Sequence, residues 1–422
     1  GAATIAATAL AAAELWKLKT GRSQQVKLDT YATAAAFRSP RYIRINGQKV
    51  AEDGSNITGF YRLKDGRWMY LHCNFPNVRD GNLKALGAQF NKESVVRAVA
   101  QRDGLELEAA MFANGGCGGF IRTEAEWERE AHQQSAARIP LFEVIKIGEA
   151  PPQPLPRGNR PLSGVRMLDL TRVLAGPACA KAFAEHGADV IRITRKDLPD
   201  LGPPSDVDTG IGKLQAHIDM RDPADAARMQ ALVKECDVFL QGYRPGSLAA
   251  RGLSPQALAK SRPGIIYTQL SAWGHEGPWA MKRGYDTVVQ SFNGMAWRPN
   301  NEKPAFLPGS PHDYIAGYVL AFATMVALHR RATVGGSWLV RTSLAGSGEW
   351  FRKLPRFTPA QYQNLPAEFP PEVLKPLLME TDSPWGRVTH LAPAVKLSET
   401  PGRWVRPPAP RGAHAAAWPT RG

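Results

Sequence analysis

The chain has 422 residues, of which 43% are hydrophobic, and a formal net charge of +15. This length suggests two or three domains, and no run of about 20 apolar residues could span a bilayer. The positive charge would suit nucleic acid or a polyanionic small molecule. Because the basic residues form no run and no nucleic-acid-binding motif is present, we expect no nucleic-acid partner and no membrane partner.

Four cysteines are spread along the chain without any C-x-x-C spacing: Cys73, Cys117, Cys179 and Cys236. Their spacing predicts neither a zinc site nor a disulfide framework and favours a reducing cytoplasm. The alanine-rich stretch Ala2–Ala13 has no basic segment before it and is short, so we do not interpret it as a signal peptide. We therefore expect a cytoplasmic protein with no bound metal.

In chain order, the first predicted unit is a helix, a glycine turn and a strand within Ala7–Phe37, and we assign residues 1–45 to a large-domain fragment. Residues 46–150 are predicted to form a small α+β domain. Its sequence "GFYRLKDGRWMYLHC" indicates two strands around the turn Lys64–Gly66, followed by helical segments. Thr123 stands three residues before Glu126, which predicts a capping box at a helix start.

Residues 151–162 are rich in proline and predict an extended linker. From 163 to 350 short strands alternate with helices, as in "GVRMLDL" followed by "GPACAKAFAEHG". This alternation is typical of a parallel sheet with helices on both faces, in which ligands bind beyond the carboxyl ends of the strands. Residues 351–422 are assigned to a C-terminal return segment. Its last stretch, "RPPAPRGAHAAAWPTRG", is expected to be poorly ordered.

The stretch Leu307–Leu344 repeats the plan of the first unit, with a helix, a glycine turn and a strand. Three pairs of residues match at a separation of 314 positions: Gly21 with Gly335, Ser23 with Ser337, and Val26 with Val340. The counterpart of Asp313 would then lie before Gly1. From the residues alone, two such units can be alike by chance, since the pattern is common. Asp313 itself precedes a helix and by its residue type fits a helix N-cap.

Several segments together resemble the family III CoA-transferases, which include formyl-CoA and carnitine CoA-transferases and the related α-methylacyl-CoA racemases. The matching segments are "PLSGVRMLDLTRVLAGPACAKAFAEHGADVIRI", "CDVFLQGYRPGSLAARGL", "RGYDTVVQSFNGMAW", "LPGSPHDYIAGYVLAFATMVALHRR", "TGRSQQVKLDTYATA", "GFYRLKDGRWMYLH" and "SETPGRWVRPPAPRGAH". The resemblance implies an α/β fold with a Rossmann-like, doubly wound parallel sheet and a second, smaller α+β domain. The segments stand in a shifted order, from which we infer a fused pair of degenerate copies.

The resemblance implies that Asp313 is the nucleophile of the reaction. An aspartate is ionised at neutral pH and can attack a thioester without a general base. A helix N-terminus at this position would lower its pKa, and free backbone amides there could bind an oxyanion. The positions that match the family's CoA contacts are Val173, Leu174, Ala175, Arg192, Arg195, Arg251, Arg283 and Tyr285. For any single arginine, a solvated surface position is the alternative.

We therefore predict an enzyme that transfers coenzyme A from an acyl-CoA donor to a carboxylic acid acceptor through covalent aspartyl intermediates. Coenzyme A is expected as a substrate and not as a tightly bound cofactor. The resemblance implies a homodimer, since members of the family form dimers of interlocked chains, and the alternative is that a fused chain imitates that arrangement by itself. The alternatives are an acyl-CoA racemase and an inactive CoA-binding relic. The racemase branch has a histidine where this chain has Tyr285, and His312 is adjacent to Asp313 but is not expected to face the same atom.

Overall fold

A seven-stranded sheet is the largest layer of the protein, whose computed structural model describes residues 1–51 and 54–420. From one edge to the other the strands are β10 (Leu214–His217), β9 (Asp189–Thr194), β8 (Arg166–Leu170), β11 (Val238–Gln241), β12 (Ile266–Ser271), β13 (Ser337–Ser343) and β7 (Glu143–Gly148). All neighbours are parallel except β7, which pairs antiparallel with β13. The predicted α/β fold with a doubly wound parallel sheet is confirmed.

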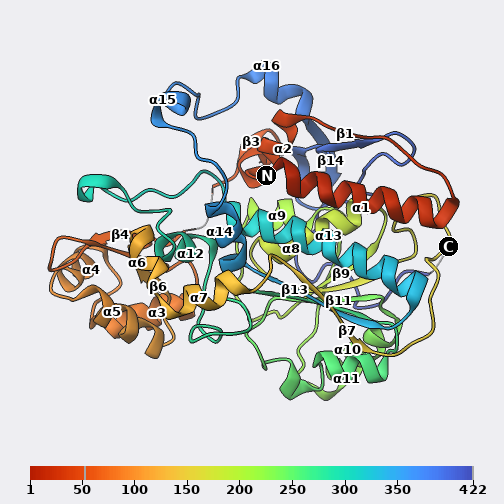
Figure 1. The fold of residues 1–422 in the computed structure, drawn as a ribbon, viewed down its shortest axis with the longest axis horizontal. Coiled ribbons are helices and arrows are strands. Elements are labelled where there is room, and N and C mark those ends of the chain that lie inside the picture. The colour runs from red at the N-terminus through yellow and green to blue at the C-terminus, as the bar shows by residue number, and fades with distance from the viewer. Residues whose placement is uncertain (52–53, 421–422) are drawn as a thin grey trace.

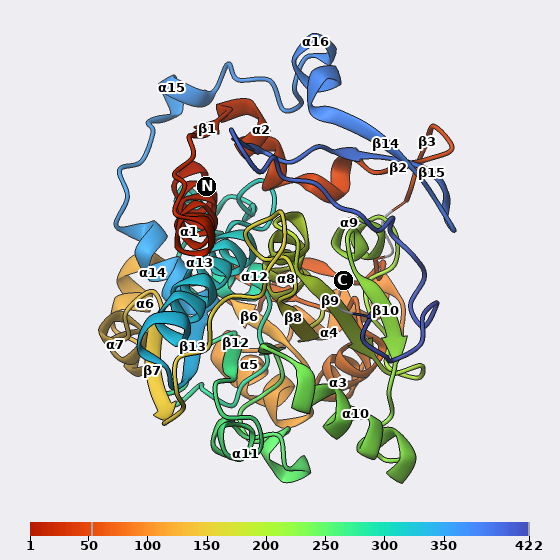
Figure 2. The ribbon, with the colours of Figure 1, turned by 90° about the vertical axis from the view of Figure 1, so that its right-hand side faces the viewer.

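Helices cover both faces of this sheet (Figure 1). Helices α8 (Ala175–Glu185) and α13 (Pro311–Val334) lie on one face, and α10 (Pro223–Glu235) and α11 (Pro255–Ser261) lie on the other, as Figure 2 also shows. All five residues of β8 are buried. Met167, Leu168 and Leu170 pack into the core, as expected for a strand covered on both faces. The two charged residues are paired, Arg166 with Glu235 and Asp169 with Lys213.

A smaller three-stranded antiparallel sheet contains β4 (Gly59–Arg62), β5 (Trp68–Leu71) and β6 (Gly118–Phe120). The first two strands form the predicted hairpin, and Gly66 adopts a positive φ of 80° in its turn. The neighbouring helices are α3 (Pro76–Leu86), α4 (Lys92–Val99), α5 (Gly104–Ala113), α6 (Glu124–Glu128) and α7 (Ala131–Arg138). The capping box at Thr123 is present. Strand β7 follows these elements in sequence, but it joins the large sheet by pairing antiparallel with β13.

The two helix–strand units recognised in the sequence adopt the same local structure. The first contains α1 (Ala2–Thr20), β1 (Val26–Leu28) and α2 (Thr30–Ala36), and the second contains α13, β13 and α14 (Leu344–Arg352). Gly335 ends α13 at 314 positions after Gly21 ends α1, and Ser343 caps α14 at 314 positions after Asp29 caps α2. Helices α1 and α13 lie side by side, and the Thr8 hydroxyl donates to the Tyr318 carbonyl at 2.8 Å. A common origin by fusion remains a prediction.

The C-terminal region returns to the first unit and then runs to the β10 edge of the large sheet. Strand β16 (Val395–Leu397) pairs antiparallel with β1, and β14 (Leu378–Ser383) and β15 (Gly386–Leu391) form a four-stranded sheet with β2 (Arg44–Ile45) and β3 (Gln48–Lys49). Helices α15 (Pro359–Tyr362) and α16 (Pro371–Leu374) precede them.

The expectation of poor order in the final stretch is wrong up to residue 420, because specific contacts hold this segment. Trp418 packs against the apolar cluster beneath β8 and donates to the Leu232 carbonyl at 3.0 Å. The Gln215 amide donates to His414 Nδ1 at 3.0 Å, and the His414 amide donates to the Gln215 carbonyl at 2.9 Å. Residues 421 and 422 lie outside the described part of the chain.

Candidate functional site

A cavity of about 1210 Å³ lies where the turn after β8 meets the start of α13. Its walls come from several parts of the sequence: residues 37–51, 72–75, 173–174, 201–205, 285–287, 309–314 and 368–374. The turn after β8 is at the carboxyl end of a parallel strand, which is where ligands bind in open α/β sheets. The sequence predicted this edge of the sheet, but it did not predict that residues 37–51 would close the cavity from the opposite side.

Asp313 lines this cavity as the third residue of α13. Ser310 stands at the N-cap, and the group that caps the helix is the carboxylate of Asp286, the first residue of α12 (Asp286–Phe292). Asp286 Oδ2 accepts from the amides of His312 at 2.7 Å and of Asp313 at 3.2 Å, and Oδ1 accepts from Gln290 Nε2 at 2.5 Å. The alternative of Asp313 as an N-cap is therefore wrong.

The Asp313 carboxylate has a different role available to it. No donor among residues 1–51 and 54–420 reaches its side-chain oxygens, although the residue is only 6% exposed. A buried carboxylate with no hydrogen-bond partner is unfavourable unless a ligand or substrate group meets it. Asp313 is thus held by its backbone at the wall of the cavity and has its carboxylate free to react.

The pKa of Asp313 is raised well above its usual value of 3.8, first by burial and second by the charge of Asp286. This direction is opposite to the expected effect of a helix N-terminus. The physical reasons are, first, that burial removes the carboxylate from water and, second, that Asp286 already occupies the positive end of the helix and repels a second negative charge. The backbone amides of His312 and Asp313 are also used by Asp286. They are not free to hold an oxyanion, so this part of the sequence-based expectation is corrected.

Val173 and Leu174 line the same cavity in the turn between β8 and α8. Val173 has a φ of 70°, a conformation that a β-branched residue rarely adopts and that costs about 1–3 kcal/mol. Such strain is found most often where a turn is shaped for a ligand. Ala175 begins α8 behind this turn and is buried, so it supports the turn from behind the cavity wall.

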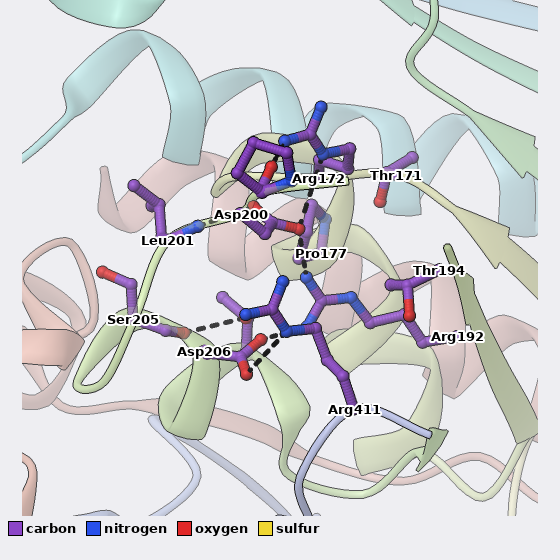
Figure 3. Close-up of polar contacts among 12 residues, drawn as sticks. Thr171, Arg172, Pro177, Arg192, Thr194, Asp200, Leu201, Ser205, Asp206 and Arg411 are labelled. Carbon is purple, nitrogen blue, oxygen red and sulfur yellow. Dashed lines mark hydrogen bonds and ion pairs between the residues drawn. The ribbon is translucent and has the colours of Figure 1, made fainter. Parts of the chain in front are cut away.

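Arg192 lies beneath the cavity in a buried cluster of charges (Figure 3). Its guanidinium is 1% exposed and donates to Asp206 at 2.6 Å and to Asp200 at 2.9 Å. Arg172 and Arg411 approach the same two carboxylates at 3.6 and 3.4 Å. Because both carboxylates are already paired with it, Arg192 has no free face for a phosphate. The ion pairs instead fix Asp200 and Asp206, which flank the 201–205 wall of the cavity.

The other predicted cationic contacts lie away from the cavity wall. Arg195 forms an ion pair with Asp197, and the exposed Arg251 donates to the Met220 carbonyl at 2.9 Å. Arg283 is half-buried near Gly115 in the small sheet region. The structure therefore brings Asp313, Val173, Leu174 and Tyr285 together and leaves the predicted arginines outside this group.

Tyr285 lines the cavity within a stack of three rings. The His72 ring lies 4.1 Å from the Tyr285 ring at an interplanar angle of 19°, and Phe75 stacks on Tyr285 at 5.4 Å. Burial raises the pKa of the Tyr285 hydroxyl, so it stays protonated and can donate. His312 does not line the cavity, and its Nε2 pairs with the Asn293 amide nitrogen at 3.2 Å. As expected, it does not share the site of Asp313.

Sequence reasoning missed three groups at this cavity. Asp286 and Gln290 stand one helical turn apart in "YDTVVQ", a spacing that could have indicated their hydrogen bond. His72 had no such signal, because only the tertiary fold brings β5 to Tyr285. The third group is a cationic wall that consists of Arg38, Arg41, Arg44 and Lys49. Glu368 pairs with both Arg38 and Arg41, which leaves this wall net positive and suited to an anionic substrate.

Within the described ranges, no helix is long and apolar enough to cross a membrane. In the same part of the chain, no three His, Cys, Asp or Glu side chains are grouped so that they could hold a metal ion. The four cysteines are buried and unpaired.

Comparison with known proteins finds similarity across the centre of the chain. Residues 162–354 match the family model "CoA-transferase family III". An acyl-CoA transferase from Gibberella moniliformis is 29% identical over 312 residues, which cover 68% of this chain and 55% of that protein. The human succinyl-CoA:glutarate CoA-transferase is 30% identical over 201 residues, which cover 44% of this chain and 46% of the relative.

The chain spans about half the length of the curated relatives it matches. Among solved structures, a CAIB/BAIF family protein from Brucella suis is 25% identical and has a TM-score of 0.44. That alignment covers 46% of this chain and 56% of the solved chain. The matched residues 162–354 contain Asp313, Tyr285 and the turn at Val173.

Proposed function

Because the chain belongs, through residues 162–354, to the family III CoA-transferases, we propose that it transfers coenzyme A from an acyl-CoA donor to a carboxylic acid acceptor. One observation carries this proposal. The buried carboxylate of Asp313 has no hydrogen-bond donor among the described residues and lines a cavity large enough for the acyl and thioester portion of a substrate. Coenzyme A is a substrate in this account.

The reaction begins when the ionised Asp313 carboxylate attacks the thioester carbonyl carbon. A carbon–oxygen bond forms and the carbon–sulfur bond breaks. Coenzyme A leaves as a thiolate, and a mixed anhydride between Asp313 and the acyl group remains on the protein. The thiolate then attacks the aspartyl carbonyl, which releases the donor acid as a carboxylate and leaves an aspartyl–CoA thioester. The acceptor carboxylate attacks this thioester, the carbon–sulfur bond breaks, and a second anhydride forms as the coenzyme A thiolate leaves. Finally the thiolate attacks the acceptor carbonyl, so that the new acyl-CoA leaves and the Asp313 carboxylate is restored.

The surroundings of Asp313 suit this chemistry. A carboxylate that accepts no hydrogen bonds and is removed from water is less stabilised than in solution, and the nearby charge of Asp286 disfavours it further. Attack on the thioester relieves both costs, since the anhydride is neutral. Asp286 also fixes the first turn of α13, so the attacking oxygen is held in one place.

The proposed substrate contacts divide between residues that line the cavity and arginines that lie outside it. We assign Val173, Leu174 and Tyr285 to the pantetheine and thioester portion. Arg195, Arg251 and Arg283 remain the proposed partners of the nucleotide phosphates, and Arg192 with Ala175 supports the turn and the 201–205 wall. The cytoplasmic location and the homodimer also remain proposals.

A second candidate activity is exchange of the α-proton of an acyl-CoA, as in a racemase. The observation that favours it is the imidazole of His72, which lines the same cavity as Asp313. Position 285 is a tyrosine, and His312 does not line the cavity, so neither of them provides an imidazole there. The presence of two acid–base groups in one cavity fits proton transfer to and from a carbon. The observations against it are the tyrosine at position 285 and the low basicity of His72, whose pKa burial lowers to about 3.

An assay in deuterated water separates these activities. The full chain would be incubated with acetyl-CoA, propionyl-CoA or succinyl-CoA together with a ¹³C-labelled carboxylic acid. The products would be separated by chromatography, and their isotope content would be measured by mass spectrometry. We expect the ¹³C label in a new acyl-CoA and no deuterium at the α-carbon. Deuterium without transfer of the label would replace our proposal with proton exchange. Binding of CoA without either product would indicate an inactive relic.

A further inference from the structure

His72 is a buried histidine at the wall of the Asp313 cavity, directly after β5. Its backbone is fixed on both sides, since its amide donates to the Cys117 carbonyl at 3.1 Å and its carbonyl accepts from Asn82 Nδ2 at 3.0 Å. Its ring is fixed by the stack on Tyr285. The imidazole is therefore held rigidly in a region that lies outside the matched residues 162–354.

One nitrogen of this ring has no partner. Nδ1 lies 3.3 Å from the Tyr70 hydroxyl, whereas the buried Nε2 meets no hydrogen-bond partner among the residues described. Leaving a buried polar nitrogen unpaired costs about 1–3 kcal/mol. Nothing in the fold requires this cost, because the stack on Tyr285 could be made by an apolar ring.

The reaction at Asp313 needs a donor that the helix cannot provide. Attack on a thioester places negative charge on the carbonyl oxygen, and one well-placed donor at such an oxygen contributes about 10²–10³ in rate. The amides at the start of α13 are occupied by Asp286. A donor on another wall of the cavity can take this place.

We propose that His72 Nε2 donates a hydrogen bond to the carbonyl oxygen of the acyl-CoA thioester in the Asp313 cavity. This inference rests on the proposed function, because it assigns a contact to the substrate of that reaction. His72 acts here as a neutral donor. It exchanges no proton with the substrate, and no covalent bond to it is formed.

The protonation of the site agrees with a neutral donor. Burial lowers the pKa of His72 to about 3, so the ring carries one proton at neutral pH. Burial also raises the pKa of the Tyr70 hydroxyl, which therefore keeps its proton and can donate to Nδ1. When Nδ1 accepts from Tyr70, the single proton of the ring is on Nε2.

A second buried histidine provides a matched control. His132 also stacks on an aromatic ring, that of Trp279, at 5.1 Å and 18°. Both of its nitrogens have partners, since Nε2 pairs with the Trp273 carbonyl at 2.8 Å and Nδ1 accepts from the Trp279 amide at 3.3 Å. His132 does not line the Asp313 cavity. Its replacement affects packing without removing the proposed contact.

The test uses acetyl-dethia-CoA, a stable ketone analogue of acetyl-CoA, labelled with ¹³C at the ketone carbon. Its ¹³C resonance would be recorded when bound to the full-length wild type, His72→Phe, His72→Gln and His132→Phe. Phenylalanine preserves the stack without a donor, and glutamine restores a donor nitrogen. We expect a downfield shift of the carbonyl resonance in the wild type, its loss in His72→Phe, partial recovery in His72→Gln, and no change in His132→Phe. In turnover, kcat should fall by about 10²-fold in His72→Phe, with KM changed less than threefold.

Each outcome bears on a specific claim. Equal carbonyl shifts in the wild type and His72→Phe would overturn the contact. A His72-dependent shift in a protein that transfers no coenzyme A would support the contact and overturn the proposed function. An analogue that does not bind would overturn both. Deuterium exchange at the α-carbon that disappears in His72→Phe would assign His72 to proton transfer and would overturn the neutral-donor role.

Discussion

Helices α1 and α13 share one sequence pattern and one local structure, but they differ in the residues that pack against them. Each helix ends at a glycine and is followed by a strand and a capped helix. The number of residues from the glycine to the capping residue is the same in both units. The first turn of α13 lies at the Asp313 cavity, where the Asp286 carboxylate accepts from the amides of His312 and Asp313. The local sequence pattern thus determines the secondary structure of both units. The residues packed around the first turn of α13 determine the environment of Asp313.

The two helices also differ in how closely they pack against a neighbouring helix at matching positions. Gly317 in α13 lies close to α8, and a Cβ built on it would be 2.5 Å from the Ala175 carbonyl oxygen. Ala3, at the corresponding position of α1, is exposed. The close approach of α13 to α8 is what brings Asp313 beside the turn at Val173.

The largest expected effect is the loss of activity in Asp313→Asn. Removal of a nucleophile should lower kcat by about 10⁴-fold or more, whereas Asp382→Asn on the exposed strand β14 should leave it unchanged. Because the raised pKa favours the protonated acid in the fold, the wild type loses stability as pH rises above the usual value of 3.8. Asp313→Asn avoids this loss, so its Tm at neutral pH should exceed that of the wild type. A lower Tm would contradict the assigned burial.

The next effect concerns packing. Gly317→Val should destabilise the protein by about 2–3 kcal/mol, because the new side chain collides with the backbone of α8. The matched change Ala3→Val should cost less than about 1 kcal/mol, since the position is exposed and only helix propensity is lost. Urea unfolding of the two variants measures the difference. Equal costs would mean that α1 is packed as closely as α13.

A smaller effect is expected from Asp286→Asn. Removal of the neighbouring charge should lower the pKa of Asp313, so the carboxylate ionises at a lower pH. The acid limb of kcat/KM for transfer should therefore move to lower pH. Loss of the charged cap should also cost about 1 kcal/mol in unfolding free energy. A pH–rate profile that does not move would show that Asp286 does not control Asp313.

The smallest effects concern the two matching helix caps. Ser343 Oγ accepts from the Gly346 amide at 2.9 Å, and Asp29 Oδ1 accepts from the Ala32 amide at 2.9 Å. Alanine at either position should cost about 0.5–2 kcal/mol. The cost at buried Ser343 should be larger than at Asp29, because water can replace the exposed cap. Thermal unfolding of both variants ranks the two caps, and the reverse order would contradict the comparison.

The sequence was sufficient for features that depend on local pattern. The parallel sheet, the hairpin at Gly66, the capping box at Thr123 and the glycine ends of α1 and α13 follow from the period of apolar residues and from turn chemistry. The meeting of Asp313 with Val173, Leu174 and Tyr285 also follows, since the resemblance to one family carried those positions.

Features that depend on distant partners were beyond sequence reasoning. Asp286 caps a helix that begins 25 residues later in the chain. Burial in the folded protein, together with the charge of Asp286, raises the pKa of Asp313 where a helix N-terminus alone would lower it. Arg192 matched a phosphate contact, but two buried carboxylates occupy it. Trp418 orders a proline-rich tail by packing against the large sheet. Each outcome is decided by a partner that pattern and propensity do not specify.

The most direct test of the account is mass spectrometry of the full chain quenched with acid during reaction with an acyl-CoA. The account predicts an added mass of an acyl group or of coenzyme A on the peptide that contains Asp313, removable by hydroxylamine and absent from Asp313→Asn. If the wild type transfers coenzyme A while no such adduct forms, or if Asp313→Asn transfers it at the rate of the wild type, Asp313 is not the covalent centre.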